Sequence, residues 1–101
     1  MKKIAFEDFE RIMTQYHATK QGCIEVYFCV DDSFVYNSSW LGKQLDQDTE
    51  KAIYWFGLIE DGSQAYDFDS FEEFANAKVF SGKSLKEIWE SISLVFLGDN
   101  K

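Results

Sequence analysis

The chain has 101 residues and carries 10 Lys and Arg against 18 Asp and Glu, which gives a formal net charge of −8. This excess of carboxylates argues against direct binding of nucleic acid, because phosphate contacts need a basic patch. Apolar residues make up 46% of the chain and aromatic residues 18%, enough to close one hydrophobic core without disulfides or a metal. We therefore expect residues 1–101 to form a single α+β domain whose charge suits a basic partner.

No apolar run approaches the ~20 residues that a membrane span needs, so no membrane contact is expected. Lys2 and Lys3 are followed by acidic residues before any apolar stretch of signal-peptide length, which predicts a cytoplasmic protein. Cys23 and Cys29 fall on one predicted strand, ~20 Å apart at ~3.3 Å per residue, a separation that predicts free thiols.

The first half of the chain predicts a helix followed by strands. Apolar residues recur every three or four positions over residues 6–18, as in an amphipathic helix. Residues 23–30 alternate in the manner of a strand, and residues 34–36 are expected to pair with it as a hairpin. Residues 37–50 show no clear period and are expected to form a loop with a helical turn.

Two further strands are expected on either side of a tight turn. Residues 52–59 are apolar on both faces, which predicts a strand in the middle of the sheet. The Asp61-Gly62 pair accepts the positive φ of a hairpin turn and leads into a strand over residues 64–68.

Two Ser-x-x-Glu spacings, starting at Ser70 and Ser84, predict the caps of two C-terminal helices. The second of these helices is expected to carry an apolar stripe from Leu85 to Phe96 and to bury Trp89 against the sheet. The expected fold is therefore α+β, with an antiparallel sheet of about four strands and with the N-terminal helix and both C-terminal helices packed on one face.

The residues that most enzymes need are scarce. His17 is the only histidine, and it falls at the end of the first predicted helix, where an imidazolium suits the helix dipole. The spacing of this histidine and the two cysteines matches no zinc site, and neither a calcium loop nor a phosphate loop is present. We expect no metal, no cofactor and no enzymatic activity. A small hydrolase built on the carboxylates Glu25, Asp67 and Asp69 remains an alternative, because acid–base hydrolysis needs only two such groups.

An acidic segment runs from Glu60 to Glu73 with aromatic residues interleaved and without Lys or Arg. One interpretation is a solvated hairpin tip followed by a helix start whose carboxylates suit the dipole. The other is a patch that steers a basic protein towards an aromatic anchor. Under the second interpretation the binding residues are Asp61, Tyr66, Asp67, Asp69, Glu72 and Glu73.

Three functional hypotheses follow. The leading one is a non-enzymatic acidic protein-binding module for a basic partner, with the general character of an immunity protein, an antitoxin or an inhibitor, although no family motif is present. The alternative is a structural or assembly accessory protein of a phage, mobile element or homo-oligomer that uses exposed aromatic rings. The third is the carboxylate hydrolase described above.

Overall fold

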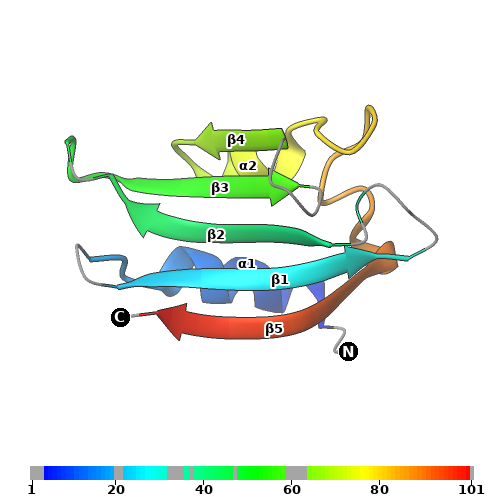
Figure 1. Ribbon diagram of the computed structural model, residues 1–101, viewed down its shortest axis with the longest axis horizontal. Coiled ribbons are helices and arrows are strands. Elements are labelled where there is room, and N and C mark those ends of the chain that lie inside the picture. The colour runs from blue at the N-terminus through cyan, green and yellow to red at the C-terminus, as the bar shows by residue number, and fades with distance from the viewer. Residues whose placement is uncertain are drawn as a thin grey trace.

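The computed structural model describes residues 4–19, 22–31, 36, 38–46, 48–58 and 64–100, the last seven by their backbone alone. The fold is α+β with an antiparallel sheet and an N-terminal helix, as the sequence predicts (Figure 1). The elements in chain order are α1 (Phe6–Gln15), β1 (Cys23–Val30), β2 (Ser39–Leu45), β3 (Ala52–Leu58), β4 (Gln64–Phe68), α2 (Phe71–Asn76), the 3-10 helix η1 (Trp89–Ser91) and β5 (Ile92–Asn100).

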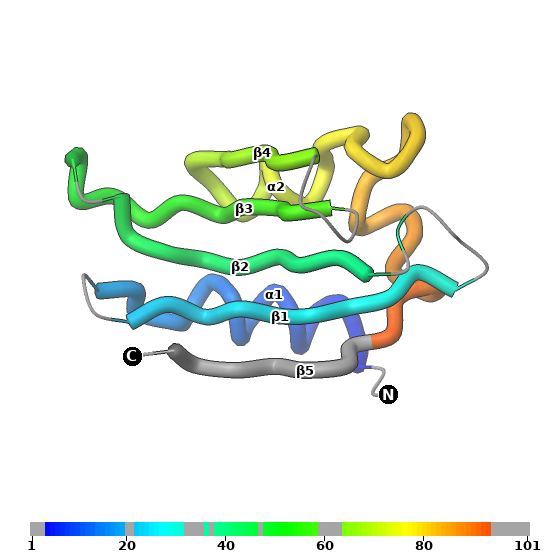
Figure 2. Tube along the Cα trace, viewed as in Figure 1, coloured from blue at the N-terminus to red at the C-terminus, as the bar shows by residue number. Residues whose placement is uncertain are grey.

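The sheet has the strand order β4-β3-β2-β1-β5, and every neighbouring pair is antiparallel. Strands β1 to β4 form a meander, so β4 is one edge of the sheet. Figure 2 shows the connection over residues 77–91 crossing one end of the sheet from the β4 side to the β1 side. Strand β5 then pairs with β1 and forms the opposite edge.

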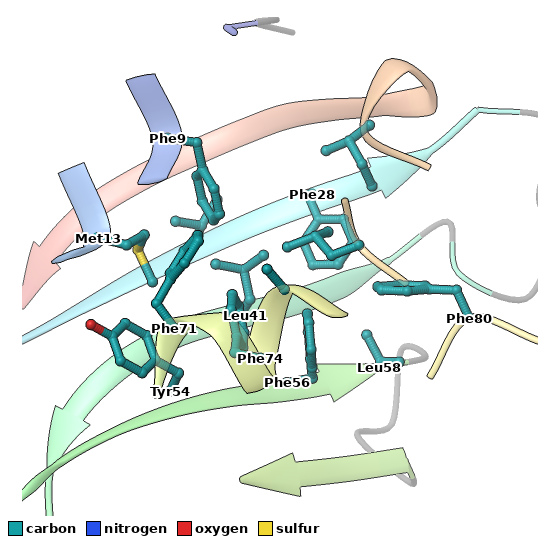
Figure 3. Close-up of a cluster of buried hydrophobic side chains, with 14 of the residues drawn as sticks. Phe9, Met13, Phe28, Leu41, Tyr54, Phe56, Leu58, Phe71, Phe74 and Phe80 are labelled. Carbon is teal, nitrogen blue, oxygen red and sulfur yellow. The ribbon is translucent and has the colours of Figure 1, made fainter. Parts of the chain in front are cut away.

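Both α-helices cover the same face of the sheet, which we call the helix side (Figure 1). The core lies between them and the sheet, and phenylalanine is its most frequent residue (Figure 3). Phe56 on β3 stacks on Phe74 of α2 with ring centroids 4.3 Å apart, and Phe9 of α1 lies 4.6 Å from the Trp89 ring. Such ring pairs add to the free energy of burying their apolar area.

The prediction of a third α-helix, with its apolar stripe from Leu85 to Phe96, is wrong. Ser84 and Glu87 do form the reciprocal cap, since the Glu87 N–H donates to Ser84 Oγ at 3.2 Å and the Ser84 N–H donates to Glu87 Oε1 at 2.9 Å. The turn nevertheless ends in η1, and residues 92–100 form a strand that pairs with all of β1. Pairing outweighs the helical pattern here, because without β5 the apolar strand β1 would be an open edge.

Residues 37–50 also differ from expectation. Their central part is the strand β2, which occupies the middle of the sheet, whereas β3, expected there, lies one place nearer the β4 edge. The helix side of β2 carries the buried Leu41 and the buried Lys43. A charged residue at a buried position hides the alternation by which a strand is recognised. Residues 34–35 of the expected hairpin lie outside the described residues, and β1 pairs with β2 instead.

Several local expectations are confirmed. The strands over residues 23–30 and 64–68 have the predicted bounds. The helix predicted over residues 6–18 is present as α1, which ends at Gln15. Ser70 caps α2, accepting a hydrogen bond from the Glu73 N–H at 3.1 Å. In the described ranges no helix is both long and apolar enough to cross a bilayer.

Candidate functional site

Five of the six predicted binding residues lie within the described chain, and all five are exposed; Asp61 lies outside it. The five are Tyr66 and Asp67 on β4, Asp69 just after that strand, and Glu72 and Glu73 in the first turn of α2.

Strand β4 divides these residues between the two faces of the sheet. Tyr66 pairs with Phe56, whose ring lies in the core, and Asp67 pairs with Trp55. Directly paired residues share a face, so Tyr66 lies on the helix side and Asp67 on the opposite side. Glu73 contributes to the α2 cap, where its carboxylate accepts from the Ser70 hydroxyl at 3.3 Å. The predicted residues therefore do not form one continuous patch.

The face of the sheet opposite the helices, which we call the open face, carries a second and more compact group of side chains. It is made of alternate positions of the five strands, as the pairing register shows. Its members, other than those described by their backbone alone, are Cys23, Glu25, Tyr27, Cys29, Trp40, Gly42, Gln44, Ile53, Trp55, Gly57, Ala65, Asp67 and Ser93.

Two aromatic side chains meet where β1 and β2 cross the open face. Tyr27 pairs with Trp40, and their ring centroids lie 5.0 Å apart. The Tyr27 hydroxyl donates to Ser38 Oγ at 2.9 Å, which fixes the tyrosine ring. Trp40 is 36% exposed. Part of this ring pair is therefore available to a partner.

Trp55 lies against the backbone of β2. A Cβ added to Gly42 would stand 2.5 Å from Cζ2 of Trp55 and 2.5 Å from the Ile24 carbonyl oxygen. No other residue fits under the ring, so glycine is required at this position. The Trp55 indole nitrogen is buried, and it has no hydrogen-bond partner in the described part of the chain.

Tryptophan and glycine alternate between β2 and β3. Each strand carries a Trp-x-Gly sequence, and antiparallel pairing places Trp40 beside Gly57 and Gly42 beside Trp55. Sequence reasoning missed this arrangement because it depends on the register between the strands. The repeated Trp-x-Gly spacing was the one signal that could have revealed it.

Charge is distributed unequally between the two sides of the sheet. The open face has the carboxylates Glu25 and Asp67, and none of its described members is Lys or Arg. Asp67 is exposed and makes no hydrogen bond or ion pair with any described residue. By contrast, Arg11 of α1 pairs with Asp8 at 2.6 Å, and Lys43 is buried on the helix side. The open face is thus aromatic and acidic.

Glu25 and Asp67, two of the three carboxylates of the hydrolase alternative, lie too far apart to act as a glycosidase-type pair. Glu25 on β1 and Asp67 on β4 lie in one cross-strand row with Gly42 and Trp55 between them. Three strand spacings separate them by about 14 Å, against about 5 to 9.5 Å in retaining and inverting enzymes. His17 is exposed beyond the end of α1, and no three His, Cys, Asp or Glu of the described residues gather as metal ligands.

Two open depressions lie on the helix side, with volumes of about 430 Å³ and 300 Å³. They share Phe6 and Lys86, whose ammonium nitrogen lies 5.9 Å from the centre of the Phe6 ring. Trp89 lines the larger one and donates its indole N–H to the Ile4 carbonyl at 2.7 Å. These rings hold α1 and the 77–91 connection together, so their contacts have a structural explanation.

Comparison with family models, curated protein sequences and solved structures gives no match for this chain. A functional assignment therefore depends on the geometry and chemistry of its own residues.

Proposed function

We propose that this chain is a non-enzymatic, acidic protein-binding module that holds a basic partner protein on its open face, in the general manner of an immunity protein or an inhibitor. The observation that supports the proposal is the composition of that face. Three aromatic side chains, Tyr27, Trp40 and Trp55, lie together with two carboxylates, and none of the described open-face residues is basic.

Each part of this surface has a physical role in such a complex. Tryptophan and tyrosine are the residues that most often supply the binding energy of protein interfaces, because they bury large rigid area at a small entropic cost. Their rings also attract Lys and Arg side chains through cation–π contacts. Asp67 and Glu25 contribute a negative field that raises the rate of encounter with a basic protein.

The acidic residues outside the open face act at longer range. Tyr66, Asp69, Glu72 and Glu73 lie around the β4 edge on the helix side or beyond the strand, and Asp61 belongs to the same acidic segment. We assign them to the rim of the partner-binding surface, with Asp67 joining the rim to the open face. Rim charges change association rate and salt dependence more than they change the dissociation rate.

The test is capture of the partner from the native cell, followed by kinetics with the purified partner. The captured protein should be basic. Asp67→Lys should slow its association about tenfold at low salt, an effect that salt removes. Glu10→Lys is the matched control, since Glu10 is an exposed carboxylate of α1 on the helix side. Equal association rates for both variants, or an acidic partner, would contradict the proposal.

Homo-oligomerisation is the second candidate, and the exposure of Trp40 favours it. Two copies meeting through their open faces would bury four tryptophan rings. They would also bring together the Glu25 and Asp67 carboxylates of both copies, and each chain has a net charge of −8, so repulsion opposes this pairing. Light scattering at micromolar protein decides the question. A dimer that Trp40→Ala converts to monomer would favour the assembly role.

A further inference from the structure

Gly57 is the second-to-last residue of β3 and is flanked by β2 and β4, a place where the described structure gives no reason for glycine. Glycine weakens a strand because it gains little from packing and loses much entropy on folding. Inside a strand it usually marks a bulge, a bend or a site where another molecule comes close to the backbone. The first two explanations can be tested directly on the pairing of β3.

The backbone around Gly57 is regular. It pairs with Trp40 of β2 and with Ala65 of β4, and neither ladder shifts register there. Of the described glycines only Gly82 has a positive φ, so Gly57 does not need the freedom of glycine. Neither a bulge nor a special backbone conformation accounts for it.

The described residues leave space for a side chain at this position. Among them, a Cβ added to Gly57 would meet one atom, Cζ3 of Trp55, at an ordinary contact distance of 3.7 Å. Gly42 is the internal comparison, because a Cβ there would collide with the Trp55 ring at 2.5 Å. The fold therefore explains why glycine is needed at position 42. At position 57 a contact with another molecule is the remaining explanation.

The surroundings of Gly57 indicate the chemistry of that contact. Trp40 and Ala65 flank it across the strands, and Trp55 lies two residues away on the same face. Asp67 is its diagonal neighbour on β4, about 7–8 Å away between backbones, within reach of a long side chain. An aromatic surface with a nearby carboxylate is the combination that binds a guanidinium or an ammonium group.

We propose that Gly57 marks the point of closest approach of the partner, and that the partner places a cationic side chain there, against the rings of Trp40 and Trp55 and beside Asp67. This inference rests on the proposed function, because it names the group through which a basic protein would be anchored. A second copy of the chain is a poorer occupant, since the described open face of that copy would offer carboxylates rather than cations.

The experiment is an NMR titration of the whole chain with a short arginine peptide, acetyl-Gly-Arg-Gly-Arg-Gly-amide, and with its glutamine counterpart. The arginine peptide should give saturable shifts of the Trp40 and Trp55 indole N–H signals and of the Asp67 amide. The glutamine peptide should bind about tenfold more weakly or not at all, because it lacks the cation.

Two variants fill the space at Gly57, and a third variant serves as the control. Gly57→Val adds a β-branched side chain that a strand accepts, and Ala65→Val narrows the same place from β4 if the first variant folds poorly. Both should weaken the arginine peptide about tenfold. Gln15→Val makes a similar change at an exposed position of α1, outside the open face, and should leave the affinity within about twofold.

Three results would overturn the inference: no saturable shift, unchanged affinity in both filled variants, or shifts confined to Glu72 and Glu73. The last result would leave the proposed function standing and move the anchor to α2. The capture experiment decides the proposed function separately, since it uses a whole partner protein rather than a peptide.

Discussion

Replacement of Lys43 by methionine tests how α1 is held against the sheet. The lysine side chain is 6% exposed, and burial lowers the pKa of its ammonium group. The ammonium nitrogen donates to three carbonyls at the end of α1, which lack partners within the helix. They belong to Met13 at 2.9 Å, Thr14 at 3.4 Å and Tyr16 at 2.7 Å.

The expected loss follows from these contacts. Methionine keeps the packing of the aliphatic stem but removes every donor. A buried carbonyl left without a partner costs about 1–3 kcal/mol. Thr14 is exposed, so water can replace the lysine there, and two carbonyls remain to be counted. The variant also no longer has a buried charge to desolvate, which offsets part of this loss of stability. We expect Lys43→Met to lower the free energy of unfolding by about 2 kcal/mol.

Urea denaturation measures the effect. With m-values of about 1–3 kcal/mol per molar, the midpoint should fall by roughly 0.7–2 M. Lys51→Met, at an exposed position, is the control and should change stability by less than about 0.5 kcal/mol. Hydrogen exchange of the Tyr16 amide, which bonds to the Ile12 carbonyl at 3.1 Å, should accelerate in the variant. An unchanged or higher midpoint would refute the reasoning, because it would mean that the desolvation free energy of the buried ammonium group equals or exceeds the stabilisation from its hydrogen bonds.

Three further predictions concern other parts of the fold. A hydrogen bond from Lys78 and one from a main-chain N–H lower the pKa of Glu87 to about 2. The Glu87 carboxylate therefore favours folding above about pH 4.5 and loses that effect as the pH falls towards 2. NMR titration of Glu87 should give a midpoint of about 2 and a higher midpoint in Lys78→Ala. Gly42→Ala should lower the free energy of unfolding by about 1–3 kcal/mol in urea melts, because the added methyl group displaces a tryptophan ring. Neither Cys23 nor Cys29 forms a disulfide, so thermal melts with and without reductant should coincide. An intramolecular disulfide found by mass spectrometry would contradict the strand β1.

The elements that the sequence predicts well are those whose signals are local. The helix α1 has a regular apolar period, the strand β1 alternates over its whole length, and Ser70 with Glu73 forms the cap that their spacing indicates. In each case the residues that carry the pattern also make the contacts. Long-range structure need not be known to interpret them.

The elements that were mispredicted depend on distant partners. Strand β2 has Lys43 on its buried face. A lysine is stable there because its ammonium group donates hydrogen bonds to carbonyls at the end of α1. Residues 85–96 carry a helical stripe, yet residues 92–96 belong to β5 because β1 requires a partner on its outer edge. In both cases a tertiary contact decides the conformation against the local pattern.

The candidate site shows the same difference between local sequence signals and contacts that depend on distant residues. Tyr66 and Asp67 are neighbours in sequence and therefore suggested one patch, but strand alternation places them on opposite faces. Trp40 and Trp55 are far apart in sequence and belong to one surface only through the register of β2 and β3. Composition indicated an acidic, aromatic-rich protein, and the pairing of strands determines which of those residues can act together.

Two ion pairs outside the open face influence where the remaining negative charge lies. Arg11 of α1 pairs with Asp8, and Lys78 pairs with Glu87 in the 77–91 connection, all four at exposed positions. Such pairs contribute little to stability, but each one offsets the charge of one carboxylate. The field of Asp67 has no nearby described cation to cancel it. In the proposed complex Asp67 and the acidic residues of the β4 edge would attract a basic partner to that side of the sheet, and the aromatic rings would then supply the affinity.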